Sequence, residues 1–346
     1  MYTSRPMSAE PVRTGVVGCG YLGRHHARIL ADLDGSAPAG FVEPDDAKAG
    51  EIESAYGAKG MVRRRSVAEL LGAGATAVVV ASPTSTHAAV AEELLAGGAD
   101  VMVEKPVTAT LDEADRLVAV AREGRRVLQV GHIERFNPAF VAVRKMNIQP
   151  RFIEVTRISP LTFRSIDVGV VLDMMIHDID LVLQLAHSKV AKIDAVGVSV
   201  IGDVEDICNA RVTFENGCVA NITASRLAMK TERRIRVFSA DAYLSVDYQK
   251  RYGMVAKRSD NVSAIRDAVA RIRSGEITDI TQLNFMDLVN LQELQIDEAD
   301  PLKAQLESFL DAATGKCDPQ VTAEEGLAAV SLATRIVQSI TPQTLA

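Results

Sequence analysis

Two ionisable side chains four residues apart, Asp173 and His177, have the types and spacing of a proton-transfer group. On an α-helix they lie on one face, and Asp180, three residues further on, can adjoin that face. Methionine and isoleucine side chains surround them, and a histidine beside a carboxylate in such surroundings can act as general acid or base. A helix-surface ion pair is the structural alternative. A metal site would need a third ligand, and no residue has a suitable spacing, so no metal is expected.

A lysine, Lys105, follows the short apolar run Val101–Val103 and precedes Pro106. The run is predicted to be a strand, which places Glu104 and Lys105 at its carboxyl end, where ligands bind in doubly wound sheets. There the lysine would face the nicotinamide end of a dinucleotide, and both residues are predicted cofactor contacts. An ordinary surface lysine is the alternative.

A G-x-G-x-x-G turn lies between a short apolar run and a helix-like pattern near the N-terminus. In such a turn Gly18 allows the tight bend, Gly20 lets the backbone approach a pyrophosphate, and Gly23 lets the helix pack closely on the strand. The helix N-terminus would then face the phosphates. A glycine-rich turn without a ligand is the alternative. The predicted cofactor contacts here are Gly18, Gly20, Tyr21, Leu22 and Gly23.

An acidic residue, Glu43, lies 20 residues beyond Gly23, at the end of the second strand-like run. A carboxylate there can accept hydrogen bonds from both adenosine ribose hydroxyls and repels a 2′-phosphate. No arginine follows directly to bind that phosphate, so NAD is the expected cofactor in preference to NADP. A solvated loop acid is the alternative.

Hydroxyl groups and a histidine follow the unbroken apolar run Ala77–Ala81. That run is typical of a buried parallel strand. Because ligands gather at the carboxyl ends of such strands, Ser82, Thr84 and His87 are predicted cofactor contacts. These residues could equally serve only the turn and the helix cap that follow.

Strands and helices must alternate to position these groups, and from residue 12 to 131 they do so. This pattern predicts an N-terminal α/β domain over residues 12–131, a Rossmann fold with a doubly wound parallel sheet. Residues 1–11 are expected to form a disordered tail. Residues 132–346 are predicted to form an α+β domain with a largely antiparallel open sheet. Its predicted strands are 152–158, 193–200, 207–214, 218–226, 235–239 and 243–248.

Composition excludes several classes of function. The 346 residues carry a formal net charge of −7, so there is no overall basic field to attract nucleic acid. No apolar run is long enough to cross a membrane, and the N-terminus lacks a signal-peptide core. The four cysteines show no C-x-x-C spacing. Reduced thiols in a cytoplasmic protein are therefore expected, without disulfides or zinc.

Three motifs together resemble the Gfo/Idh/MocA family of oxidoreductases: Gly18–Gly23, Glu104-Lys105-Pro106, and Asp173 with His177. The resemblance covers nearly the whole chain. It implies oxidation or reduction of sugar and cyclitol carbons with NAD(P), and a catalytic group of Lys105, Asp173 and His177. It also implies a homodimer or homotetramer formed through the C-terminal sheet. The Lys105–Pro106 bond is expected to be cis, as it often is in this family.

Within that family, the segments Gly131–Pro138 and Ser159–Asp173 are most similar to nucleotide-sugar dehydrogenases. The resemblance implies UDP-N-acetylglucosamine as substrate, oxidised at the 3-hydroxyl to a 3-oxo sugar used in lipid A biosynthesis. The predicted substrate contacts are Arg135, Asn137 and Arg164, since arginine suits a diphosphate. Each arginine could instead form an ordinary salt bridge. An inositol or other polyol dehydrogenase, and a non-catalytic NAD-binding sensor, are the alternative functions.

The ordinary pKa values of the two candidate bases differ. A lysine has a pKa of about 10.4 and a histidine one of about 6.5, so only the lysine needs a large shift to become a base near neutral pH. His177 is therefore the expected base, oriented by a neighbouring acid. Lys105 would stabilise the developing alkoxide. The opposite assignment stays open, because a cationic cofactor and His177 could lower the pKa of Lys105.

Overall fold

The structure, a computed structural model, describes residues 10–162, 168–278 and 291–342. The chain forms two compact units. The first comprises residues up to Phe136 together with Asp300–Leu332, and the second comprises Asn137–Ala299 and the residues from Ala333 onward. The expected second domain ran without interruption from residue 132 to the C-terminus. The structure instead assigns a C-terminal helical segment to the first unit.

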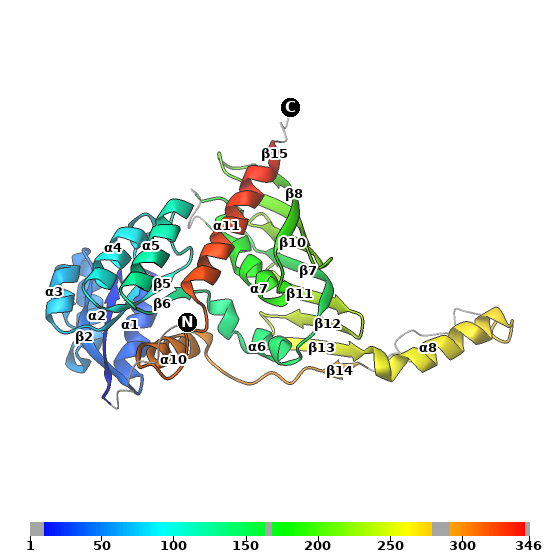
Figure 1. The fold of residues 1–346 in the computed structure, drawn as a ribbon, viewed down its shortest axis with the longest axis horizontal. Coiled ribbons are helices and arrows are strands. Elements are labelled where there is room, and N and C mark those ends of the chain that lie inside the picture. Colours follow the sequence, from blue (N-terminus) through cyan, green and yellow to red (C-terminus); the bar gives the residue numbers. More distant parts are fainter. Residues whose placement is uncertain (1–9, 163–167, 279–290, 343–346) are drawn as a thin grey trace. The chain divides into compact units, whose positions relative to one another are not determined.

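The first unit is built on a six-stranded parallel sheet in the order β3-β2-β1-β4-β5-β6. In Figure 1 the sheet lies among the blue and cyan helices, with β2, β5 and β6 labelled. This order is that of a dinucleotide-binding Rossmann fold, in which the strand order reverses between β1 and β4 while all strands stay parallel. It confirms the predicted doubly wound sheet. The strands are β1 (Val12–Val17), β2 (Ser36–Val42), β3 (Arg63–Arg64), β4 (Ala77–Val80), β5 (Asp100–Glu104) and β6 (Leu128–Gly131).

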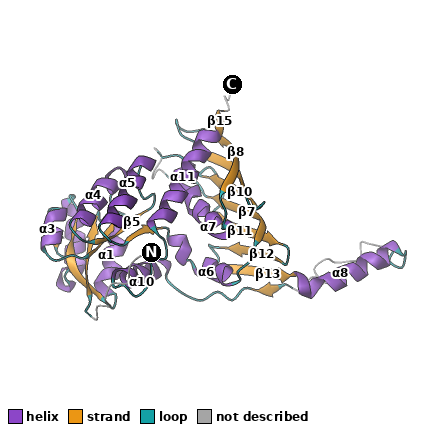
Figure 2. Cartoon of the chain, in the orientation of Figure 1, coloured by secondary structure: helices purple, strands orange, loops and turns teal. Residues whose placement is uncertain are grey.

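Helices cover this sheet, and one of them, from the distant C-terminal segment, is drawn beside α1 in Figure 2. Leu306 and Phe309 of the first C-terminal helix are buried in one apolar cluster with Val16, Phe41 and Met102 of the sheet. This shared core is why the segment belongs to the first unit. The helices are α1 (Gly23–Asp32), α2 (Asp46–Tyr56), α3 (Val67–Gly72), α4 (Thr84–Ala96), α5 (Leu111–Glu123), α10 (Pro301–Ala313) and α11 (Ala323–Ser339), whose end enters the second unit.

The second unit contains a nine-stranded sheet in the order β14-β13-β12-β11-β7-β10-β9-β8-β15. Most neighbours are antiparallel, as predicted, but β7–β10 and β8–β15 pair in parallel. The strands are β7 (Pro150–Ile158), β8 (Val190–Val198), β9 (Ile207–Phe214), β10 (Val219–Ser225), β11 (Glu232–Ser239), β12 (Ala242–Asp247), β13 (Tyr252–Lys257), β14 (Gln292–Glu293) and β15 (Ile340–Pro342).

One face of this sheet is apolar and packs on α7 (Ile176–Ala186), while the other carries polar pairs between strands. On the polar face Asn209 donates to Thr223 at 2.8 Å and Arg211 donates to Asn221 at 3.0 Å. Buried and more exposed residues accordingly alternate along most of β10. The sequence did not predict β13, β14, β15 or the helix α8 (Arg258–Arg273).

The segment with Asp173 and His177 is helical, but not uniformly α-helical. A π-helical turn, η3 (Val171–Met175), precedes α7 directly. Asp173 therefore lies in the π turn and His177 in the following α-helix. The expected regular i,i+4 face is replaced by a junction of two helix types, and such π turns occur often at functional sites. No helix in the described part of the chain is both long and apolar enough to span a membrane.

Candidate active site

The glycine-rich loop joins β1 to α1 and has the geometry that a pyrophosphate requires. Gly18 has φ +86°, and a Cβ there would lie 2.5 Å from the Ser82 amide nitrogen. A Cβ on Gly23 would lie 1.8 Å from the Gly18 carbonyl oxygen, whereas one on Gly20 would meet nothing within 4 Å. The loop is thus closed on its protein side and open at Gly20, at the N-terminus of α1. This geometry fits the pyrophosphate of NAD, and the contact of each loop residue with the cofactor stays a prediction.

Two predicted contacts beside Gly20 are accessible to a ligand. Tyr21 is 62% exposed, and its ring lies 5.9 Å from the His25 ring and 5.3 Å from the Arg24 guanidinium. Leu22 precedes α1 and is partly exposed. Both can therefore contact a cofactor, as predicted.

Glu43 is buried at the end of β2 and holds the glycine-rich loop. One carboxylate oxygen accepts a hydrogen bond from the Cys19 amide at 2.7 Å, and the other accepts from the Asp45 amide at 3.0 Å. The solvated-acid alternative is therefore excluded. Each carboxylate oxygen can accept more than one hydrogen bond, so a ribose contact remains chemically available. Burial, and secondarily Glu43, raises the pKa of the Cys19 thiol to about 12, so this thiol stays neutral.

An arginine that the sequence analysis did not consider lies beside Glu43. Arg63 of β3 donates to the carbonyl oxygens of Glu43 and Pro44 at 3.1 and 3.0 Å and pairs with Asp46 at 2.6 Å. The absence of an arginine directly after Glu43 in the sequence therefore does not mean its absence in space. The Arg63 guanidinium is thus bound to two backbone carbonyls and to one carboxylate. A 2′-phosphate would have to compete with these contacts for the guanidinium.

Of the three predicted contacts after β4, two are partly exposed and one is buried. Ser82 and Thr84 are partly exposed, and the Ser82 hydroxyl lies 2.7 Å from the Thr86 hydroxyl. His87 is buried, and its two ring nitrogens lie 2.9 Å from the carbonyl oxygens of Ser82 and Pro106. The ring therefore joins the loop after β4 to the loop after β5, and the predicted cofactor contact of His87 stays a prediction.

The end of β5 carries a buried acid followed by a partly exposed lysine. Glu104 is 6% exposed and lies 2.8 Å from the Nε2 atom of His26, a buried residue of α1. This pairing directs one carboxylate oxygen to α1, and the predicted cofactor contact of Glu104 stays a prediction. Lys105 is more accessible, and the Lys105–Pro106 bond is cis, as expected. The sequence analysis missed His26, although a histidine at a buried position of α1 was a readable signal.

In the second unit, ion pairs and backbone contacts fix the segment with Asp173 and His177. Asp178, next to His177, is buried and accepts two hydrogen bonds from Arg157 of β7, at 2.7 and 2.9 Å. Glu205 accepts a hydrogen bond from the Val171 amide at 3.0 Å, which holds the start of the π turn. Bidentate arginine–carboxylate pairs orient helices strongly. Lys105 belongs to the first unit, and Asp173 and His177 to the second.

The predicted substrate contacts have different outcomes. Arg135 is 1% exposed and pairs with Glu325 at 3.4 Å, as in the salt-bridge alternative, and its contact with a diphosphate stays a prediction. Asn137 is partly buried and caps helix α6 (Pro138–Lys145) by accepting from the Ala139 amide at 3.1 Å. Arg164 lies outside the described residues. Asp180, the possible orienting acid, is buried in α7.

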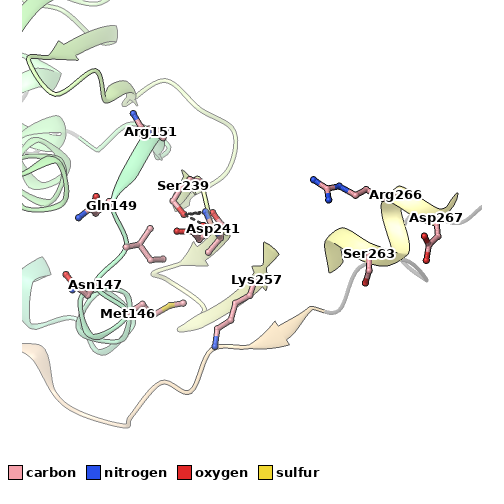
Figure 3. A pocket seen from close by; sticks show the side chains of 13 residues that line it. Met146, Asn147, Gln149, Arg151, Ser239, Asp241, Lys257, Ser263, Arg266 and Asp267 are labelled. Carbon is pink, nitrogen blue, oxygen red and sulfur yellow. Dashed lines mark hydrogen bonds between the residues drawn. The ribbon is translucent and has the colours of Figure 1, made fainter. Parts of the chain in front are cut away.

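A pocket in the second unit lies apart from these residues. It is lined by the loop after α6, the turn between β11 and β12, and the start of α8 (Figure 3). Ser239 organises the turn by accepting hydrogen bonds from the amides of Asp241 and Ala242 at 3.1 and 2.8 Å. Of the predicted site residues that the structure describes, none lines this pocket. Within residues 10–162, 168–278 and 291–342, no three His, Cys, Asp or Glu side chains are grouped as metal ligands.

Comparisons with known proteins agree with this geometry. Residues 12–132 match an oxidoreductase family with an NAD-binding Rossmann fold, and residues 154–245 match the GFO/IDH/MocA C-terminal domain. UDP-N-acetylglucosamine 3-dehydrogenase from Acidithiobacillus ferrooxidans is 39% identical over 238 residues, which cover 68% of this chain and 74% of that protein. Its solved structure superposes with a TM-score of 0.82, at 32% identity over 95% of this chain and 97% of that one.

A second relative is named for a cyclitol and not for a nucleotide sugar. Inositol 2-dehydrogenase from Rhizobium meliloti is 26% identical over 342 residues, which cover 95% of this chain and 97% of that protein. The matched domains, the glycine-rich loop and the similarity to both dehydrogenases lead to one conclusion. The chain belongs to the Gfo/Idh/MocA family and is an NAD-dependent oxidoreductase that acts on CH–OH groups.

Proposed function

We propose that the protein oxidises the 3-hydroxyl of UDP-N-acetylglucosamine. The observation that carries this proposal is the 39% identity to UDP-N-acetylglucosamine 3-dehydrogenase, against 26% for the inositol enzyme. The similarity of the solved structure over nearly the whole of both chains supports it as well. A nucleotide sugar is thus a better-supported substrate than a cyclitol.

The proposed chemistry assigns separate tasks to three side chains. Bound NAD supplies a ring carbon that accepts the hydride. His177 accepts the hydroxyl proton, because its ordinary pKa is closest to neutral pH. Lys105 donates a hydrogen bond to the reacting oxygen and stabilises the developing negative charge. Asp173 binds a sugar hydroxyl or tunes the other two groups.

The surroundings of His177 support this assignment. The Arg157–Asp178 pair anchors α7 at the residue after His177, and Glu205 holds the Val171 amide at the start of the π turn. A base must be held in a narrow range of positions to contribute fully to catalysis. The proposed base thus lies on a segment fixed at both ends by buried or backbone contacts.

Binding of the diphosphate is proposed chiefly through Arg164, because the Arg135 guanidinium is buried against Glu325. A contact of Arg135 with this anion stays a prediction. Asn137 keeps a proposed role in hydrogen bonding to the sugar or nucleotide, in addition to its capping role.

A panel of substrates tests the proposal. The protein is incubated with NAD and, in turn, UDP-N-acetylglucosamine, UDP-glucose, free N-acetylglucosamine, myo-inositol and glucose, and NADH absorbance is followed. A glutamate-dependent aminotransferase is added to consume the unstable 3-oxo product and draw the reaction forward. The proposal predicts turnover of the first compound and an amine in place of a hydroxyl by mass spectrometry. Oxidation of inositol or glucose with UDP-N-acetylglucosamine left intact would refute it.

The alternative substrate is a cyclitol or another free sugar, favoured by the inositol dehydrogenase match, which extends along nearly the whole chain. Its distinguishing result is turnover of myo-inositol or a hexose in the same panel.

We also propose that the protein forms a homodimer or homotetramer through the polar face of the second sheet. The paired side chains of Asn209, Thr223, Arg211 and Asn221 give this face a hydrogen-bonding surface that is not solely apolar. Light scattering during size-exclusion chromatography measures the mass directly. A monomer of 37.2 kDa at micromolar concentration would contradict the proposal.

A further inference from the structure

A buried pair of ionisable residues joins the cofactor-binding helix to the strand that precedes Lys105. His26 lies on α1 with 0% of its surface exposed, and its Nε2 atom is 2.8 Å from the Glu104 Oε1 atom. These two atoms are within hydrogen-bond distance, and a carboxylate oxygen can accept such a bond from a ring N–H. The two residues are 78 positions apart in the sequence, so this contact is made by the fold alone.

The second carboxylate oxygen of Glu104 contacts the backbone of the proposed catalytic lysine. Its Oε2 atom accepts a hydrogen bond from the Lys105 amide at 3.3 Å. Gly131 of β6 lies opposite Glu104 in the sheet, and a Cβ there would come within 2.7 Å of Oε2. The glycine therefore leaves the space that the carboxylate occupies. One oxygen faces His26 and the other faces the backbone of Lys105.

We propose that His26 is a positioning residue for the dehydrogenase reaction. Its hydrogen bond fixes the orientation of Glu104, and Glu104 in turn fixes the backbone at Lys105 and the direction of its side chain. The same contact ties the carboxyl end of β5 to α1, which begins at Gly23 of the glycine-rich loop. The distance between the phosphate-binding loop and the lysine is thereby held constant. This inference rests on the role proposed for Lys105.

Three single variants separate positioning from simple stability. His26→Leu removes the donor, His26→Gln keeps an N–H donor for Glu104, and His25→Gln is the control on the neighbouring, partly exposed histidine. Since a displacement of about 1 Å can cost about 100-fold in rate, we expect His26→Leu to lower kcat about 10- to 100-fold. We expect KM and the NAD dissociation constant to change less than about threefold, and His26→Gln to recover most of kcat. Native kcat in His26→Leu would overturn the proposal, as would equal losses in both His26 variants.

A double-mutant cycle tests whether His26 acts through Glu104. If it does, the losses of kcat in His26→Leu and Glu104→Gln are not additive, and the double variant resembles the worse single variant. Additive losses of kcat would contradict the proposal that His26 acts through Glu104. Should His26→Leu fail to fold, Gly131→Ala displaces the Glu104 carboxylate without changing His26 and is expected to lower kcat as well. Native kcat in a folded Gly131→Ala protein would also contradict the proposal.

A readout without turnover separates this inference from the proposed function. The rate at which an amine-reactive acylating reagent modifies Lys105 is measured by peptide mass spectrometry, with and without NAD. We expect His26→Leu to change this rate at least threefold, and His25→Gln to leave it unchanged. An unchanged rate in His26→Leu overturns the positioning role. If the rate changes but Lys105→Met retains full turnover, the role of Lys105 in the proposed function fails instead.

Discussion

Three alanine substitutions at glycines separate the folding and ligand-binding roles of the glycine-rich loop. A Cβ on Gly23 would lie 1.8 Å from the Gly18 carbonyl oxygen, more than 1 Å inside the closest approach that real Cβ atoms show. The obstructing atom belongs to the backbone, so the loop itself must shift. Overpacking of this kind costs about 1–3 kcal/mol or more. At about 2–4 °C per kcal/mol for a folding unit of about 150–250 residues, Gly23→Ala should lower Tm by about 2–12 °C.

Gly20→Ala should leave Tm nearly unchanged and weaken NAD binding. Its Cβ would meet nothing within 4 Å, so Tm should stay within about 2 °C of the native value. The added methyl group occupies the space that a pyrophosphate requires. A clash of about 1–3 kcal/mol would weaken NAD binding about 5- to 150-fold. Gly50→Ala, in α2, is the matched control: its Cβ is equally unobstructed, and it should raise stability slightly without changing NAD affinity.

Thermal melting and isothermal titration with NAD measure both quantities on the same samples. Native NAD affinity in a folded Gly20→Ala protein would refute the assignment of this loop to the pyrophosphate. A native Tm in Gly23→Ala would refute the packing argument. The comparison with Gly50→Ala excludes a general effect of replacing a glycine with alanine.

Three further predictions concern single side chains. Glu43→Gln removes the charge that repels a 2′-phosphate but keeps an acceptor for the Cys19 amide. Isothermal titration should therefore show a smaller difference between the dissociation constants of NAD and NADP in this variant than in the native protein. Tighter binding of NADP than of NAD by the native protein would contradict this. His177→Ala should lower kcat by about 10²–10⁴-fold with nearly unchanged NAD affinity, and near-native turnover at saturating substrate would remove His177 from the chemistry. Burial, and secondarily Glu205, raises the pKa of the Cys208 thiol from 9.0 to about 12, so its contribution to stability is complete below pH 9 and is lost as pH rises towards 12. At pH 10 the loss of stability is about 1 kcal/mol, and denaturant unfolding at pH 8 and 10 should show a shallower pH dependence in Cys208→Ala. Equal slopes in the native protein and the variant would contradict this.

Local patterns in the sequence predicted the first sheet and the roles of its glycines. Alternating apolar runs and helical periodicity predicted a doubly wound parallel sheet, because the rules for connections between strands leave few other topologies. The strand order itself comes from the structure. Gly18, Gly20 and Gly23 are constrained by the turn itself, and their geometry agrees with the prediction. The cis bond before Pro106 was likewise expected and is present.

Contacts between distant segments could not be predicted in this way. The burial of Arg135 against Glu325 spans 190 positions, and the pairing of His26 with Glu104 spans 78. Side chains that look available for a ligand in the sequence make contacts inside the protein. The packing of α10 on the first sheet also depends on a shared core and not on local periodicity.

Transfer of a label from carbon 3 of the sugar to NAD tests the central claim most directly. The protein is incubated with NAD and UDP-N-acetylglucosamine carrying deuterium at C3, with the aminotransferase present, and the reduced cofactor is analysed by mass spectrometry. The proposed reaction predicts reduced NAD that carries one deuterium, and a primary isotope effect on the rate if hydride transfer limits turnover. Reduced NAD without deuterium, or no reduced NAD while myo-inositol is oxidised under the same conditions, would contradict oxidation at C3.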